Sequence, residues 1–226
     1  MIKIITTYGQ LLLIAMGRTL LLAFLGLIFA CILGMIFGLL SVVKNKACNI
    51  IAQIFVFVIR GVPMIVLAFY VFFGIPYLLN TILGIGNGFT LSALQAGVIC
   101  LALNCGAYMA EIIRAGIQSI DQGQTEAARS LGLSQTMNLR YIILPQALKN
   151  ILPAIANEFV VIIKESAITY TIGVQDIMSA VNAVKGATFI IIEPLLVATA
   201  IYFCLCFPTS KLIAYFERRM SHGDKR

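Results

Sequence analysis

Long apolar runs, separated by shorter polar segments, make up most of the chain. A helix that crosses a bilayer needs about 20 mostly apolar residues, and several stretches reach this length. The candidate spans are residues 16–43, 50–73, 90–113, 151–174 and 188–213. This pattern predicts an all-α integral membrane protein with about five transmembrane helices, in which residues 1–226 form a single domain.

One polar segment, residues 115–149, lies between the third and fourth candidate spans and is too hydrophilic to cross a membrane. Asp121 suits the N-cap of a helix, residues 122–131 are rich in helix-forming side chains, and Gly132 suits the left-handed position that ends a helix. We therefore predict a short amphipathic helix. On these residues alone, it either covers the surface of the protein or docks onto a partner.

Composition supports the membrane assignment. Hydrophobic residues make up 61% of the chain, charged residues make up 11%, and the mean hydropathy is +1.00. That apolar excess is larger than one soluble core could bury, so an ordinary soluble domain is excluded. The net charge is +7, but the basic residues form no patch interleaved with aromatic residues, so no nucleic-acid partner is expected.

The distribution of basic residues predicts the orientation. If residues 115–149 face the cytoplasm, eleven of the 16 Lys and Arg residues lie in cytoplasmic segments, and only Lys3 and Lys185 lie outside. An excess of Lys and Arg marks the cytoplasmic loops of membrane proteins. We therefore expect an outside N-terminus and a cytoplasmic C-terminus, although Lys3 and Arg18 weakly favour the opposite orientation.

The first candidate span carries small residues at a strict four-residue spacing. They are Gly26, Ala30, Gly34 and Gly38. Small side chains on one face of a membrane helix allow another helix to approach closely. This stripe predicts tight helix packing and no chemistry.

The fourth candidate span is the least hydrophobic and carries charges at membrane depth. At 100° per residue, one half of its circumference collects polar side chains. They include Asn157, Glu158, Lys164, Glu165 and Thr169. An isolated charge costs about 2.5–3.5 kcal/mol at the bilayer centre, so these side chains should face protein or a water-filled path. They form either a substrate pathway or an internal ionic cluster that holds helices together.

Arg60 lies at membrane depth in the second candidate span, three residues before Pro63. An arginine within a span is a candidate functional group, and the proline breaks the helical hydrogen-bond ladder beside it. Arg60 therefore either joins the substrate pathway, or has a structural role in which it snorkels to the cytoplasmic interface or braces a helix end. A zwitterionic ligand would need both charges, which Arg60 or Lys164 and one of the two glutamates could supply.

Catalytic chemistry is not visible in the sequence. The chain contains one histidine and no G-x-x-x-x-G-K-[ST] phosphate-binding motif. Its six cysteines show neither the spacing of metal ligands nor a disulfide framework. We expect no enzyme activity and no cofactor bound to this chain.

Four motifs along the chain carry a family resemblance. The second span contains Arg60-Gly61-Val62-Pro63, similar to R-G-[TV]-P, and residues 106–116 are similar to G-A-Y-x-A-E-x-x-R-[GA]-G. Lys164-Glu165-Ser166 with Ile172-Gly173-Val174 is similar to K-D-[TS]-S-L…I-G-V. The polar segment contains Glu126-Ala127-Ala128, then Gly132, and after nine residues Ile142-Ile143-Leu144-Pro145. Along nearly its whole length, the chain resembles the permease subunits of bacterial polar amino acid ABC importers.

Two positions depart from the family pattern. Glu165 stands where the family commonly has aspartate, and Ala167 replaces the usual serine. The longer acidic side chain should alter which ligand fits, while the fold should stay the same.

The resemblance implies a type I ABC importer-like fold with a cytoplasmic coupling helix that docks onto an ATPase. The residues it assigns to this coupling are Glu126, Ala127, Ala128 and Gly132. It further implies two ABC ATPase subunits that hold ATP and Mg, a second permease subunit that is a copy or a paralogue, and an external solute-binding protein. The chain would then lie in the bacterial cytoplasmic membrane, among lipids, and import a polar amino acid by alternating access.

Two other functions remain open at this point. An ion-coupled secondary transporter or channel would use the charges of the fourth span as an ion or proton relay, but it would not explain the segment around Glu126. A purely structural membrane subunit would tolerate changes to the polar residues of the fourth span without a transport defect.

Overall fold

The computed structural model describes residues 2–43 and 45–221, and these residues form helices without any strand. The α-helices are α1 (Ile2–Leu40), α2 (Lys46–Gly61), α3 (Met64–Phe69), α4 (Ile75–Tyr77), α5 (Ala93–Gln118), α6 (Gln122–Ser130), α7 (Gln135–Asn138), α8 (Leu144–Glu165), α9 (Ile177–Thr188) and α10 (Ile192–Ser221). Three π-helical segments, η1 (Tyr70–Gly74), η2 (Leu78–Ile82) and η3 (Leu139–Ile143), and one 3-10 segment, η4 (Ser166–Ile172), complete the order.

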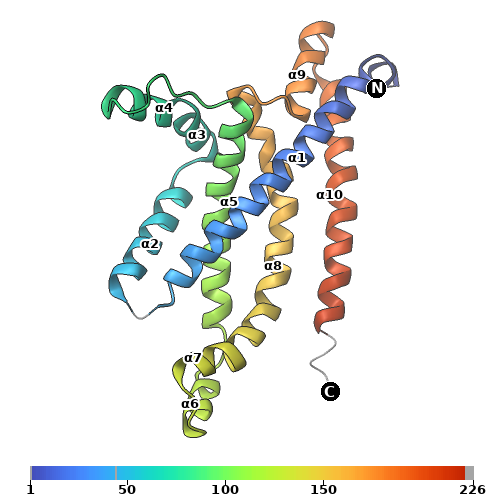
Figure 1. Ribbon diagram of the computed structural model, residues 1–226. Coiled ribbons are helices and arrows are strands. Elements are labelled where there is room, and N and C mark those ends of the chain that lie inside the picture. Colours follow the sequence, from blue (N-terminus) through green and yellow to red (C-terminus); the bar gives the residue numbers. More distant parts are fainter. Residues whose placement is uncertain (1, 44, 222–226) are drawn as a thin grey trace.

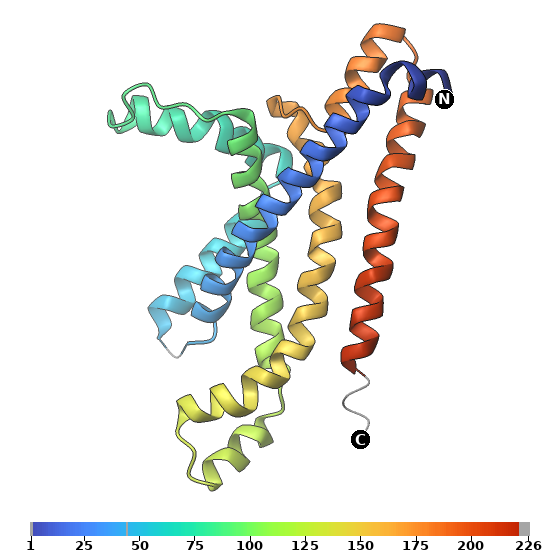
Figure 2. The ribbon, with the colours of Figure 1, turned by 45° about the vertical axis from the view of Figure 1, so that its right-hand side comes forward.

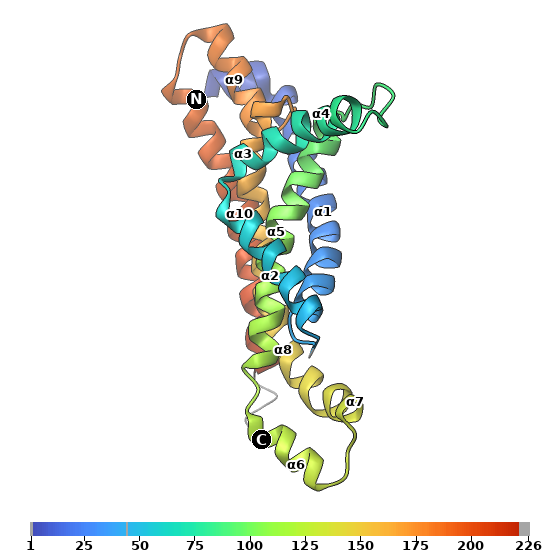
Figure 3. The same cartoon turned by 90° about the vertical axis from the view of Figure 1, so that its left-hand side faces the viewer.

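Helix α5 forms the centre of the bundle and is buried along most of its length. Helix α1 crosses it diagonally, and α8 runs alongside it (Figure 1). Helix α2 packs against the lower half of α5 and the end of α1, as Figure 3 shows from another side. Because α5 is covered from several sides, any polar side chain on it must face either a partner or a cavity.

The small-residue stripe of α1 packs directly against α5, as predicted. A Cβ atom added to Gly34 would lie 2.5 Å from the Cβ of Met109, and one added to Gly38 would lie 2.8 Å from the Cβ of Ile113. Real Cβ atoms do not approach so closely. The glycines therefore set the distance between the two helices.

Four helical segments are long and apolar enough to cross a membrane: Ile2–Leu40, Met64–Ile82, Ala93–Gln118 and Ile192–Arg219. Helix α8 has the length of a fifth span, since 22 residues rise about 33 Å. It carries charged side chains along its length, at Lys149, Glu158, Lys164 and Glu165. The first span begins fourteen residues earlier than the sequence pattern suggested, because its polar start remains helical.

The prediction of one continuous second span over residues 50–73 is wrong. Helix α2 ends at Gly61, Val62 has an extended backbone (φ −107°, ψ 132°), and α3 begins after Pro63. Proline has no N–H and pushes the preceding residue out of the helical region, so hydropathy continues across the break while the helix does not. Beyond it, α3, η1, α4 and η2 form an arm that projects sideways from the bundle (Figure 2).

The helix of the fourth span changes from α-helix to 3-10 helix after Glu165. After Glu165, α8 continues as the 3-10 segment η4, which ends at Gly173 with a left-handed backbone (φ 90°). The hydroxyls of Ser166, Thr169 and Thr171 each donate 2.7 Å hydrogen bonds to the carbonyl three residues earlier. Such local bonds compete with the regular helical ladder and accompany the tighter turn.

The polar segment forms the predicted short helix, α6. The Asp121 side chain accepts a hydrogen bond from the Gly123 N–H at 2.7 Å, and Gly132 has a left-handed backbone (φ 79°). The N–H of Leu133 donates to the Ala128 carbonyl at 3.0 Å, and the N–H of Gly132 donates to the Arg129 carbonyl at 2.9 Å. These two bonds define a Schellman motif.

Different helices lie at the two ends of the molecule. Helices α6 and α7 project from one end, which is also where α10 finishes, while the start of α1 and helix α9 lie at the opposite end (Figure 1). The segment between α5 and α8 covers residues 119–143.

Candidate functional site

Two glutamates of α8 face the central helix α5. Glu165 Oε2 accepts a hydrogen bond from Asn104 Nδ2 at 2.7 Å. Glu158 Oε2 accepts from the Cys105 thiol, with 3.5 Å between oxygen and sulfur. The two glutamates are seven positions apart, so they lie on the same face of α8 within about 20°.

The two carboxylates both bond to neighbouring residues of α5. Their backbones are about 10 Å apart along α8, at 1.5 Å per residue, yet their side chains reach consecutive residues of α5, Asn104 and Cys105. Both partners are uncharged. Two carboxylates brought together in a low-dielectric environment repel each other, and a cation placed between them would relieve this repulsion.

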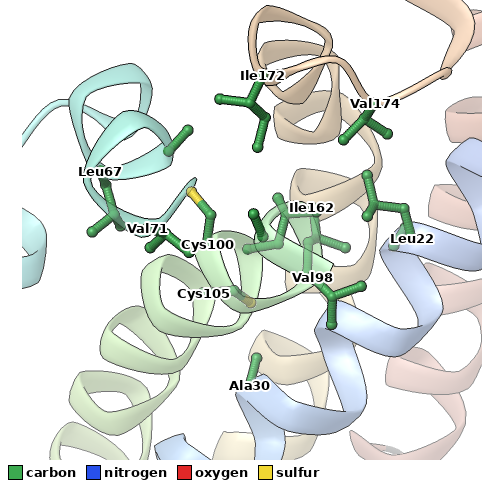
Figure 4. Packing of buried hydrophobic residues seen from close by; sticks show 14 of the residues in the cluster. Leu22, Ala30, Leu67, Val71, Val98, Cys100, Cys105, Ile162, Ile172 and Val174 are labelled. Atoms are coloured by element: carbon green, nitrogen blue, oxygen red, sulfur yellow. The ribbon is translucent and has the colours of Figure 1, made fainter. Parts of the chain in front are cut away.

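The break after Pro63 brings a third element to this place. The first residue of α3, Met64, has its sulfur 3.9 Å from Asn104 Nδ2, and its carbonyl accepts from the Cys100 thiol at 3.9 Å. Figure 4 shows Cys100 and Cys105 of α5 with the apolar residues that pack around them. The site is therefore built from α3, α5 and α8, and its surroundings are apolar.

The other polar residues predicted on α8 do not share this position. Lys164 and Asn157 are exposed on the surface of the chain, while Glu158 and Glu165 are half-buried against α5. Thr169 is fully buried in η4 and donates its hydroxyl to the Ser166 carbonyl at 2.7 Å. The polar half of α8 thus divides into a part that faces α5 and a part that faces outward.

Arg60 lies in the last turn of α2, and its guanidinium lies over the ring of Tyr108 on α5, 4.8 Å from the ring centre. This is the geometry of a cation–π contact. Arg60 and Tyr108 line a cavity of about 930 Å³ between α1, α2 and α5, together with the ion-paired side chains of Glu111 and Arg114. The cavity lies toward the α6 end of α5.

Asn104 and Tyr108 were not identified as site residues from the sequence. With Glu111 they occupy positions four and three residues apart on α5, which places them on one face of a helix. That spacing of polar side chains within an apolar span was the available signal. These three polar positions of α5 lead from the two carboxylates to the cavity beside Arg60.

The predicted coupling residues lie on α6 and at its end. Glu126 and Ala127 are exposed, whereas Ala128 is buried against the segment that follows. Asn138 Nδ2 donates to Thr125 Oγ1 at 3.2 Å and so ties α7 to α6. Leu131, which the sequence did not single out, is 80% exposed at the end of α6.

No group of three or more His, Cys, Asp or Glu side chains that could hold a metal ion occurs within residues 2–43 and 45–221.

Comparison with known proteins places the chain in one family. The family described as "Binding-protein-dependent transport system inner membrane component" matches residues 26–222. The chain is 40% identical over 174 residues to the arginine transport system permease protein ArtQ of Bacillus subtilis, covering 77% of this chain and 76% of that protein. It is 36% identical over 182 residues to a putative glutamine transport system permease protein of Rickettsia conorii, covering 80% of each.

Solved structures share the fold. A chain from a crystal structure of an amino acid ABC transporter with histidines is 40% identical, with a TM-score of 0.86 over 95% of this chain and 96% of that one. A chain of the inward-facing MetNI methionine ABC transporter shows the same fold at 19% identity, with a TM-score of 0.77 over 95% of this chain and 98% of that one. The chain therefore belongs to the family of binding-protein-dependent transport system inner membrane components and is a permease subunit of an ABC importer.

Proposed function

We propose that this permease carries a basic amino acid across the bacterial cytoplasmic membrane by alternating access, driven by ATP hydrolysis on separate ATPase subunits. The observation that carries the substrate class is the convergence of Glu158 and Glu165 on neutral partners of α5. A ligand with an extra positive charge would add a cation on the side that faces α5, whereas the neighbouring charge of Lys164 is exposed on another side of α8. Among the relatives, one is named for arginine transport and another for glutamine transport, so the polar amino acid class has independent support.

The path for the ligand follows the polar face of α5. From the carboxylate pair beside Asn104, the next polar positions are Tyr108 with Arg60, and then the cavity that Glu111 lines. The positive charge of Arg60 opposes the passage of a cationic ligand, so this step needs a movement of α2 relative to α5. The short extended connection at Val62 allows α2 to move without α3.

The proposed partners follow from the two ends of the molecule. Helix α6 would dock onto one of two ABC ATPase subunits, which hold ATP and Mg, through Glu126 and Ala127. A second permease subunit would enclose the ligand path, and a solute-binding protein would deliver the amino acid at the α9 end. In this arrangement the C-terminus would lie in the cytoplasm and the N-terminus outside, an orientation that the excess of basic residues at the α6 end supports.

The test is uptake by the complete transporter, with its ATPase and binding protein, reconstituted in liposomes that contain ATP. We expect labelled arginine or lysine to be taken up, and unlabelled glutamine or glutamate to compete less well. Uptake that depends on a proton gradient and not on ATP would refute the mechanism. Equal uptake of acidic and basic amino acids would refute the substrate class while leaving the ATP-driven mechanism in place.

A further inference from the structure

Helix α10 stands at one side of the bundle (Figure 1) and carries a ridge of five exposed side chains at a strict four-residue spacing. The α10 ridge consists of Phe203, Phe207, Lys211, Tyr215 and Arg219. Residues four apart on a helix are neighbours, and each step turns by about 40°, so the ridge winds along one side of α10. Another side of α10 packs against the bundle, where Tyr202 and Leu205 contact the apolar core.

The first three side chains of the α10 ridge contact one another. The rings of Phe203 and Phe207 are stacked, with 5.1 Å between their centres. Lys211 Nζ lies 5.5 Å from the centre of the Phe207 ring. An aromatic ring attracts a cation but carries no net charge. The ridge therefore begins as an apolar aromatic surface and continues as a basic one.

The charged residues of α10 indicate where the helix leaves the hydrocarbon core of the membrane. Between Glu193 and Lys211 the sequence of α10 contains no charged residue, and these 18 positions rise about 27 Å. The hydrocarbon core of a bilayer is about 30 Å thick, so Lys211 lies at one edge of it. Tyr215 lies about 6 Å beyond that edge, at the level of the lipid headgroups. Arg219 lies one turn further out, and its long side chain can return to that level.

We propose that an anionic phospholipid binds on the α10 ridge. Its acyl chains lie along Phe203 and Phe207. Its phosphate accepts hydrogen bonds from Lys211, Tyr215 and Arg219, since ammonium, phenol and guanidinium groups are all donors. Lys211 lies ten positions before the end of α10, too far from the helix C-terminus for the helix dipole to compensate its charge. A lipid phosphate at the same depth supplies the counter-charge.

The acidic residue nearest to the basic part of the ridge does not interrupt it. Glu217 lies at least about 120° around the helix from both Lys211 and Arg219, at 100° per residue. The side of α10 that carries the ridge is therefore basic at headgroup level. A phosphatidylcholine molecule is neutral overall because its choline carries a positive charge, so the ridge should prefer a lipid with a net negative charge.

A second copy of this chain fits the ridge less well than a lipid does. Subunits related by a two-fold axis along the membrane normal place identical residues at the same depth. Two α10 ridges in contact would therefore bring Lys211 and Arg219 toward the same basic residues of the other copy, and like charges repel each other. Charge complementarity thus favours the anionic lipid.

Tryptophan fluorescence tests the proposal, because the chain contains no tryptophan of its own. Phe207→Trp keeps an aromatic ring beside Lys211. The full-length permease with this substitution would be reconstituted in bilayers of phosphatidylcholine and phosphatidylglycerol, with bromine on the acyl chains of one lipid or the other. Bromine quenches tryptophan only at short range. We expect the ratio of the two lipid binding constants to favour phosphatidylglycerol about fivefold, the factor for one basic side chain near an anionic surface.

Two comparisons separate the ridge from a general preference of the protein for anionic lipid. Leu196→Trp is the matched control, because Leu196 is exposed and lies within about 20° of Phe207 around the helix, at the opposite end of the apolar stretch. We expect a ratio near one there. Combining Lys211→Gln with Arg219→Gln should bring the ratio at position 207 close to one, whereas Lys211→Arg should preserve it. Quenching at position 196 in the same background shows that the variant is inserted.

Three results would overturn the proposal. The first is a ratio near one at position 207 in the parent background, or an equal preference for phosphatidylglycerol at positions 196 and 207. The second is a preference at position 207 that persists when both basic residues are replaced. The third is a tryptophan at position 207 that neither brominated lipid quenches, which would show that another protein surface covers the ridge.

Discussion

Asn104 of α5 donates a 2.7 Å hydrogen bond to Glu165 of α8, and this bond joins two helices whose residues are 61 positions apart. The amide holds the carboxylate in place without neutralising it. Removing the charge of Glu165 while keeping its size therefore separates recognition of a cationic ligand from packing of the helices.

We expect Glu165→Gln to raise the half-saturating concentration of a basic amino acid about tenfold to a hundredfold, since a hydrogen bond to a charged group contributes about 1.5–3 kcal/mol. Uptake kinetics in proteoliposomes provide the measurement. Lys164→Met is the matched control, because Lys164 is the neighbouring charge but is exposed on another side of α8. Unchanged kinetics in Glu165→Gln and in Glu158→Gln would show that the pair is structural.

A side chain larger than hydrogen at Gly34 should destabilise the bundle. The added Cβ of Gly34→Ala would lie 2.5 Å from the Cβ of Met109, so α1 and α5 would have to separate. Overpacking of this kind costs about 1–3 kcal/mol, which should lower the thermal unfolding temperature in detergent. Gly17→Ala on the same helix has nothing within 4 Å, so it should not lower that temperature and should raise it slightly, because alanine favours the helix more than glycine does. Equal effects of both substitutions would contradict the packing described for the stripe.

Because Gly132 has a left-handed backbone, a β-branched side chain at this position should destabilise the end of α6. Gly132→Val should cost about 1–2 kcal/mol at this position, and we expect weaker co-purification of the ATPase or hydrolysis uncoupled from uptake. Gly132→Asn is the informative comparison, because asparagine tolerates the left-handed region. Normal coupling in Gly132→Val, together with normal coupling in Glu126→Lys, would remove α6 from the coupling surface.

Thiol labelling tests the orientation. In a background that lacks accessible native cysteines, Asn87→Cys should react with a membrane-impermeant reagent in intact cells, because residue 87 lies in the exposed turn before α5. Ser134→Cys, between α6 and α7, should be protected until the membrane is opened. The reverse pattern would place α6 outside.

Burial raises the pKa of the Asp176 carboxyl from 3.8 to about 6, although hydrogen bonds from backbone N–H groups at the start of α9 oppose the shift. Because the pKa is higher in the folded state, the free energy of unfolding falls as the pH rises from about 4 to 6 and stays low above that. Arg18 of α1 and Tyr202 of α10 are the ionisable side chains that face this region from the helices packed against α9.

Asp176→Asn has no carboxyl to titrate and keeps the cap, so it should gain thermal stability relative to the parent protein between pH 4.5 and pH 7.5. Melting curves of the detergent-solubilised complex at both pH values measure this difference. A gap that narrows as the pH rises would have the wrong sign and would show that the ionised carboxyl is stabilised in the folded protein.

Features that depend on neighbouring residues were predictable from the sequence. The spacing of Gly26, Ala30, Gly34 and Gly38 was sufficient to predict the contact with another helix, and Asp121 with Gly132 was sufficient to delimit α6. Pro63 was a sequence signal for a helix break, but the apolar run continues across it. Hydropathy alone therefore predicted one continuous span, because it carries no information about a change in helix direction.

Features that depend on which helices meet were not predictable in the same way. A helical projection assigns Glu158, Lys164 and Glu165 to one half of α8, but only the position of α5 decides that the two glutamates are covered while Lys164 is exposed. Asn104 acquires its role from a residue 61 positions later. Local periodicity carries no information about that pairing.

Helix α6 is only nine residues long, and an isolated helix of that length is marginal in water. Here Asp121 caps the N-terminus of α6, and the Schellman motif at Gly132 caps its C-terminus. The hydrogen bond from Asn138 to Thr125 holds α7 against α6. These restraints stabilise α6 as a helix along its whole length of about 13 Å, where an isolated segment would fray. If α6 docks onto an ATPase, a displacement at Glu126 would reach α7, η3 and the start of α8 with little local unwinding of α6.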